Sequence, residues 1–132
     1  MEMKMMVIRK PVTVNVSHGD IDDIMSTALE GGITHWASAA RVGGDYLGNC
    51  ASEQISRGGT LYIEEIEDGT VFTLTREKFM DGLREFIRES AFDYDCLRRE
   101  DNGTYTLDAC QIDAEAADMI VQYAVFDELV YG

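Results

Sequence analysis

The sequence has few of the residues that stabilise small or unusual folds: it contains one proline, three cysteines and one tryptophan. An odd number of cysteines cannot pair completely, no C-x-x-C spacing occurs, and neither histidine has a zinc-ligand spacing to a cysteine. No apolar run approaches the roughly 18 to 20 residues that span a bilayer, and residues 1–10 lack the apolar segment of a signal peptide. We therefore expect a cytoplasmic protein without disulfides, bound metal or cofactor.

Basic residues are also scarce. The chain has 11 lysines and arginines against 25 aspartates and glutamates, which gives a formal net charge of −14. Most of such a surface repels DNA, RNA and anionic membranes, so we expect neither long nucleic acids nor a membrane as partners. A small anionic ligand is still compatible with this charge, because a few arginines and backbone N–H groups can make the potential positive within one pocket.

The bulk composition is that of an ordinary folded domain. Apolar residues make up 45% and charged residues 27% of the sequence, which is too apolar for intrinsic disorder. A chain of 132 residues matches the common size of one domain, and no linker, repeat or low-complexity tract divides it. We expect residues 1–132 to form a single domain.

The first half of the chain predicts a strand followed by helices. Alternating valines over residues 12–16 indicate a strand with one buried face. Apolar residues three and four apart indicate a helix near 20–30 that ends at Gly31. For residues 34–49, which are rich in small residues and glycine, we expect a short helix followed by an irregular loop, and for 51–55 another short helix.

The second half predicts a β-hairpin and two more helices. Residues 61–66 and 70–75 are rich in β-branched and aromatic side chains, and the Glu-Asp-Gly between them suits a tight turn. An apolar stripe indicates a helix over 76–89 capped by Thr75, and a last helix over 113–126 begins at a capping aspartate.

The order of these elements predicts the fold class. A short strand over 104–107 follows a polar stretch, so strands and helices do not alternate regularly along the chain. We expect an α+β fold, in which a small antiparallel sheet that includes the hairpin packs against the helices near 20–30, 76–89 and 113–126.

The segment from Gln54 to Thr60 is the strongest candidate for a binding site. Two adjacent glycines permit positive φ and can bring successive N–H groups toward an anion, hydroxyls flank them, and the arginine offers a bidentate fork to a phosphate. A helix end followed by a turn into a strand explains the same residues without a ligand, and the segment lacks the Lys-Ser/Thr ending of a P-loop. As a binding site it would comprise Gln54, Ser56, Arg57, Gly58, Gly59 and Thr60.

Four residues outside this segment also have side chains suited to a nucleotide. Trp36 and Tyr46 can stack on a base, although core packing is the simpler explanation for each. Arg98 can contact a phosphate, or it can lie in an exposed loop of mixed charge. Asn49 is included for the chemistry of its side chain, in the same glycine-interrupted region as Tyr46.

No catalytic group is evident in the sequence. Neither His18 nor His35 lies in a pattern that pairs it with a cysteine nucleophile. Asp22 and Asp23 could bind Mg²⁺, but the favourable field at a helix N-terminus explains them more simply. We therefore expect a protein that binds its ligand without catalysis.

Four stretches together resemble a group of phage proteins. They are Asp20–Met25, Ala28–Ile33, Gln54–Thr60 and Ala117–Ala124, and most of the chain is similar to small proteins of phages and prophages of gut Firmicutes. These resemble in turn the Thoeris anti-defence sponges, which sequester the cyclic ADP-ribose isomers made by a bacterial TIR enzyme without cleaving them. The sponges are hexamers that hold cyclic ADP-ribose isomers between subunits and cyclic trinucleotides near a threefold axis.

The resemblance carries expectations for this chain. It implies a homo-oligomer, a hexamer as in that family, which blocks anti-phage defence from within the host cytoplasm. It also implies that Gln54–Thr60 binds phosphate, with Arg57 repeated by symmetry around a cyclic trinucleotide.

Two other functions remain compatible with the sequence. An acidic inhibitor, comparable to an anti-CRISPR protein, would mimic nucleic acid and occupy a basic groove of a host defence complex. A phosphodiesterase would need catalytic partners that the sequence does not supply. Uptake and recovery of an intact nucleotide would distinguish the sponge from both.

Overall fold

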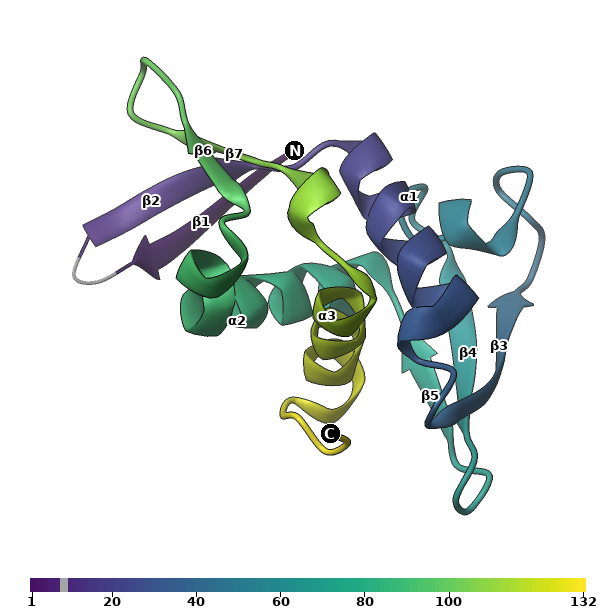
Figure 1. Cartoon of the computed structure of the whole chain (residues 1–132). Helices are drawn as coiled ribbons and strands as arrows, with labels where there is room; N and C mark the ends of the chain where they lie inside the picture. Colours follow the sequence, from purple (N-terminus) through teal and green to yellow (C-terminus); the bar gives the residue numbers. More distant parts are fainter. Residues whose placement is uncertain (8–9) are drawn as a thin grey trace.

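The structure is a computed structural model that describes residues 1–7 and 10–132, and it confirms the α+β class. Three α-helices pack together, and one small sheet lies on each side of them (Figure 1). The elements follow the order β1 (Glu2–Val7), β2 (Lys10–Asn15), α1 (His18–Thr27), the π-helical turn η1 (Ala28–Gly32), β3 (Ala37–Gly43), the 3-10 turn η2 (Ala51–Glu53), β4 (Thr60–Glu65), β5 (Val71–Leu74), α2 (Arg76–Tyr94), β6 (Leu97–Arg99), β7 (Tyr105–Leu107), the 3-10 turn η3 (Ala109–Gln111) and α3 (Ala114–Phe126).

The first sheet joins segments that are far apart in the sequence. Its strand order is β1-β2-β7-β6, with β2 parallel to β7 and the other pairs antiparallel. The strand predicted over 12–16 corresponds to β2, and the one predicted over 104–107 corresponds to β7. The sequence does not predict β1 or β6, because the strand conformation of these segments depends on pairing with β2 and β7.

The second sheet contains the predicted hairpin. Its strand order is β3-β4-β5, and the bounds of β4 and β5 lie within one residue of the prediction at each end. Gly69 in the connecting turn has a φ of 73°, which glycine adopts without steric cost. Leu61, Ile63 and Leu74 are fully buried, so one face of the hairpin packs on the core.

The short helix predicted within residues 34–49 is wrong, whereas the irregular loop predicted after it is present over residues 44–49. In place of the helix the structure has the strand β3, which pairs antiparallel with β4. Alanine favours a helix locally, but pairing with a neighbouring strand supplies the backbone hydrogen bonds and overrides that preference. The short helix predicted over 51–55 is reduced to the single turn η2.

The three predicted helices are present, and their ends have identifiable causes. Ser17 caps α1 in a reciprocal arrangement, in which its hydroxyl accepts from the Asp20 N–H and the Asp20 carboxylate accepts from the Ser17 N–H. Thr75 and Asp113 cap α2 and α3 as predicted, although α2 continues past residue 89 to Tyr94. Among the described residues, no helix combines the length and apolar character needed to cross a membrane.

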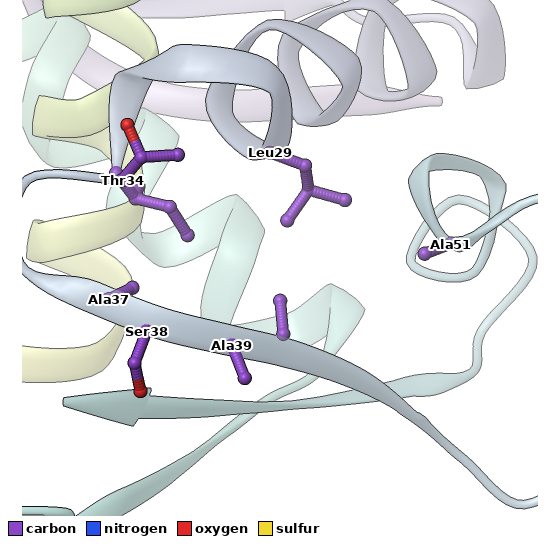
Figure 2. A pocket seen from close by; sticks show the side chains of 8 residues that line it. Leu29, Thr34, Ala37, Ser38, Ala39 and Ala51 are labelled. Carbon is purple, nitrogen blue, oxygen red and sulfur yellow. The ribbon is translucent and has the colours of Figure 1, made fainter. Parts of the chain in front are cut away.

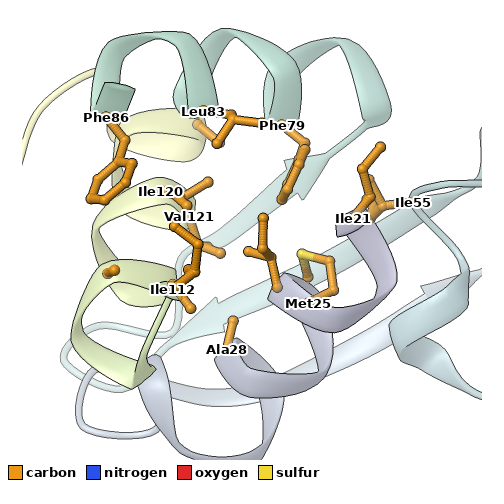
Figure 3. Close-up of a cluster of buried hydrophobic side chains, with 14 of the residues drawn as sticks. Ile21, Met25, Ala28, Ile55, Phe79, Leu83, Phe86, Ile112, Ile120 and Val121 are labelled. Carbon is orange, nitrogen blue, oxygen red and sulfur yellow. The ribbon is translucent and has the colours of Figure 1, made fainter. Parts of the chain in front are cut away.

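The core lies where the three helices meet (Figure 3). The axes of α2 and α3 approach closely at Gly82, where a Cβ would lie 2.6 Å from the carbonyl oxygen of Ile120 and 2.7 Å from the amide nitrogen of Ala124. The contact therefore requires glycine at this position. The helical side chains that fill the core include Ile21, Met25, Phe79, Leu83, Phe86, Ile120 and Val121.

Gly82→Ala tests this helix contact. We expect the free energy of unfolding to fall by about 1–3 kcal/mol, because an extra methyl group in a packed interior forces the backbone to shift. Urea unfolding followed by circular dichroism measures the change. Gly31→Ala is the matched control, since nothing lies within 4 Å of a Cβ at that exposed position. Equal destabilisation by both substitutions would contradict the close approach of α2 and α3.

The three cysteines should differ in reactivity. Cys96 is buried, and burial raises the pKa of its thiol to about 11, whereas Cys50 and Cys110 are exposed. Because the thiolate is the reactive form, we expect iodoacetamide at pH 8 to alkylate Cys50 and Cys110 well before Cys96. Mass spectrometry of the labelled peptides measures the order, and the difference should disappear in urea. Early labelling of Cys96 in the folded protein would be inconsistent with its burial.

Candidate functional site

The segment predicted to bind an anion forms the turn between η2 and β4. Gly58 has a φ of 85°, as the paired glycines suggest. The N–H of Gly58 donates to the carbonyl of Ile55 at 3.0 Å, and that of Gly59 donates to the carbonyl of Gln54 at 2.9 Å. These two N–H groups therefore close the turn and are not directed at a ligand, so an anion at this turn must be bound by side chains.

Gln54 is a buried clamp and not an exposed contact. Its Nε2 donates to the carbonyl of Asp45 at 3.1 Å and to that of Gly43 at 3.5 Å, and its Oε1 accepts from the Leu47 N–H at 3.1 Å. A Cβ at Gly59 would lie 2.5 Å from Nε2, so Gly59 provides the space for this amide. The clamp holds the loop 44–50 beside the turn.

Ser56 and Thr60 also serve the fold: Ser56 bonds to another element, and Thr60 belongs to a strand. The Ser56 hydroxyl is buried and donates to Asp22 at 2.5 Å, which joins the turn to α1. Thr60 is the first residue of β4 and lies opposite Gly43 of β3. Asp22 thus has a local role as the acceptor for Ser56, in addition to its favourable place near the start of α1.

Arg57 is the exposed side chain of the turn. It lies across Gly48, where a Cβ would come within 2.9 Å of Nε, and its Nη2 is 3.3 Å from Oε2 of Glu53. The pKa of Glu53 is lowered, chiefly by the hydrogen bonds from the Asn49 N–H and the Cys50 thiol and less by Arg57. An exposed ion pair of this kind contributes little to stability, so the Arg57 guanidinium can exchange Glu53 for a stronger acceptor.

The structure brings a second arginine to the same turn. Arg76 begins α2, its Nη1 donates to the carbonyl of Ser56 at 3.1 Å, and its Nη2 lies 3.8 Å from the position of a Cβ on Gly58. It thus bonds to the residue before Arg57 and lies beside the residue after it. Within residues 1–7 and 10–132, Arg76 forms no ion pair with an acidic side chain.

Sequence reasoning missed Arg76. A cation in the first turn of a helix is placed against the helix dipole, which is unfavourable without an anionic partner. An arginine directly after the capping Thr75 was therefore a usable signal. The sequence could not show that this helix start lies beside the turn at Gly58.

Tyr46 and Asn49 lie in the loop that Gln54 holds next to Arg57. Tyr46 is 62% exposed, and its neighbours on both sides in the chain bond to the Gln54 side chain. Asn49 is exposed, and its N–H donates to Glu53 at 2.8 Å. The loop thus exposes an aromatic ring and an amide side chain, and at Gly48 it lies against Arg57.

Trp36 and Arg98 lie elsewhere, so their assignment to this site is corrected. Trp36 is buried, its Nε1 donates to Asp118 at 2.7 Å, and its ring stacks on Tyr131 with the centroids 5.7 Å apart. Trp36 is therefore packed in the core and is not exposed for stacking on a base. Arg98 lies in β6 of the first sheet and pairs with Asp108 at 2.9 Å.

Among the described residues, the histidines and carboxylates considered for catalysis or metal binding do not form a metal-binding cluster. His35 Nε2 lies 2.8 Å from Asp118, whose other oxygen accepts from Trp36 and from Gln122, so this carboxylate holds the core together. In the part of the chain that the structure describes, no three His, Cys, Asp or Glu side chains are grouped as metal ligands.

A separate cavity of about 320 Å³ lies between η1, β3 and η2 (Figure 2). None of the residues predicted as a site lines it. Its walls carry no ionised side chain and are formed by Leu29, Ile33, Thr34, Ala37, Ser38, Ala39, Ala40 and Ala51.

Comparisons with protein-family models, curated proteins and solved structures find no match to this chain.

Replacing Gln54 tests the clamp that positions Tyr46. We expect Gln54→Leu to lower the free energy of unfolding by about 1–3 kcal/mol, because it removes the hydrogen bonds that the buried Gln54 carboxamide makes to Gly43, Asp45 and Leu47. Hydrogen exchange at residues 44–50 should accelerate more than exchange elsewhere. Gln111→Leu, at an exposed glutamine, is the matched control. Unchanged exchange in the loop would show that Gln54 does not hold it.

Proposed function

We propose that this protein is a non-catalytic binding protein that sequesters small anionic nucleotides. The observation that carries the proposal is that Arg57 and Arg76 both lie at one exposed turn, beside the loop 44–50 that carries the exposed side chain of Tyr46. Two guanidinium groups suit phosphate oxygens, and an aromatic ring suits the face of a base.

The acidity of the molecule fits a small ligand better than a polymer. With a net charge of −14, the surface around the site repels a long polyanion, whereas a compact ligand needs only the local field of the arginines. Glu53 beside Arg57 adds selectivity, because a ligand must replace this carboxylate with a better acceptor.

The specific ligands are proposed from the resemblance to the Thoeris anti-defence sponges. They are cyclic ADP-ribose isomers, and also cyclic trinucleotides if copies of Arg57 meet around a threefold axis of a hexamer. Binding without cleavage would remove the immune signal from the cytoplasm of the infected host and so block anti-phage defence.

A second function is favoured by the charge itself. A surface with 25 acidic and 11 basic residues suits an inhibitor that mimics nucleic acid and occupies a basic groove of a host defence complex. Such an inhibitor would bind in a salt-sensitive way and would need neither Arg57 nor Arg76.

Native mass spectrometry tests the proposed function directly. The protein is mixed with cyclic ADP-ribose isomers or cyclic trinucleotides, and the spectrum reports subunit number and ligand occupancy together. We expect a homo-oligomer that retains nucleotide, and release by denaturation should return the ligand intact. Cleaved product would identify an enzyme, and no uptake of any of these nucleotides would refute the sponge.

Arginine substitutions test the site. We expect Arg57→Ala and Arg76→Ala each to weaken nucleotide binding by about 10- to 100-fold, the loss of a hydrogen bond to a charged group. Arg88→Ala is the matched control, because Arg88 is an exposed arginine of α2 that pairs with Glu85 at 2.9 Å. Isothermal titration calorimetry measures the three affinities. Equal weakening by all three substitutions would indicate a general charge effect and not a site.

A further inference from the structure

The strand β3 is paired along one edge only. It pairs with β4 over Ala37–Gly43 and ends the second sheet. Within residues 1–7 and 10–132, no backbone group of Ser38–Val42 bonds to an element other than β4. Alternate N–H and C=O groups of such an edge strand point away from the sheet and can pair with another extended chain.

The cavity of about 320 Å³ lies along this free edge. Four consecutive residues, Ala37–Ala40, line it. A β-bulge interrupts the register between Ala37 and Ala39, so consecutive residues in this part of β3 border the same cavity. Figure 2 shows Leu29 of η1 across from the strand and Ala51 of η2 at one end.

The lining restricts the chemistry of an occupant. The Thr34 hydroxyl donates to the carbonyl of Gly31 at 2.9 Å, and the Ser38 hydroxyl donates to Glu64, so neither has its proton free for a ligand. The remaining side chains are aliphatic. What the cavity offers is therefore a strand edge for backbone hydrogen bonds and an apolar wall for small side chains.

Proline and lysine, two residues that protect edge strands, are absent from Ala37–Gly43, and beyond a β-bulge between Ala37 and Ala39 the strand pairs with β4 in regular register. Long charged side chains also commonly block edge strands. Here the only charged residue among Ala37–Gly43 is Arg41, which lies 3.6 Å from Glu64 of the neighbouring strand.

We infer that this groove binds an extended peptide segment of a positively charged partner protein, which adds a strand to β3 and places small apolar side chains against Leu29. Strand addition combines main-chain hydrogen bonds with pockets for alternate side chains, and the groove provides both. The net charge of −14 favours a basic partner. The inference is independent of the nucleotide site, because the two share no residue.

Selection from a random library of extended peptides tests the inference. Peptides of about a dozen residues, the length of a long strand with flanking charges, are displayed on phage and selected on the protein. The same library is selected in parallel on Ala51→Leu, which fills one end of the cavity. We expect the protein to enrich peptides with β-branched residues flanked by lysine or arginine, and Ala51→Leu to enrich none of them.

The best peptide is then synthesised, and its affinity is measured by fluorescence anisotropy. We expect binding to weaken at least about tenfold in Ala51→Leu and at high salt, and to be unchanged in Ala114→Leu, which makes the same substitution at an exposed alanine. Backbone amide signals of residues 37–43 should shift in NMR spectra. If Ala51→Leu does not fold, Thr34→Phe narrows the cavity from an exposed lining position.

Three outcomes would overturn the inference. They are enrichment of the same peptides on Ala51→Leu, NMR shifts confined to residues outside the groove, and a dimer in sedimentation equilibrium that Ala51→Leu dissociates. The last result would identify a second copy as the occupant. Loss of nucleotide binding in Arg57→Ala with intact peptide binding would separate this site from the nucleotide site.

Discussion

The candidate site depends on the hydrogen bonds made by the buried carboxamide of Gln54. One side chain bonds to Gly43, Asp45 and Leu47, and it occupies the space that Gly59 leaves by having no Cβ. Since a buried amide that loses its partners is costly, the turn and the loop 44–50 are held in one arrangement. Arg57 and Tyr46 are consequently presented by a fixed scaffold, although both are exposed.

A fixed scaffold matters because of the overall charge. In a molecule with a net charge of −14, a single mobile arginine would find an acidic neighbour, as Arg57 does with Glu53. Arg76 differs, because its bond to the Ser56 carbonyl keeps it beside the turn without an acidic partner among the described residues. The proposed function therefore depends on a small positive region that the tertiary structure maintains within an acidic surface.

The two candidate sites have opposite chemistry. The turn 54–60 offers the charge of Arg57 and Arg76, and the neighbouring loop exposes Tyr46, whereas the cavity beside β3 is lined by small and aliphatic side chains without charge. Small residues make the second site possible, since the alanines of β3 leave room that larger side chains would fill. The same alanines favour a helix locally, so the helix predicted within residues 34–49 was replaced by a strand once pairing with β4 became available.

The sequence by itself determined the features that depend on neighbours along the chain. These were the hairpin with its turn at Gly69, the helix caps at Thr75 and Asp113, the apolar stripes of the helices, and the positive φ of Gly58. Only the tertiary structure decided which exposed groups meet. It buried Trp36 against Tyr131, paired Arg98 with Asp108, and brought the start of α2 to the turn at Gly58. The physical reason is that caps and turns satisfy backbone groups within a few residues, whereas the environment of a side chain depends on segments that approach it only after folding.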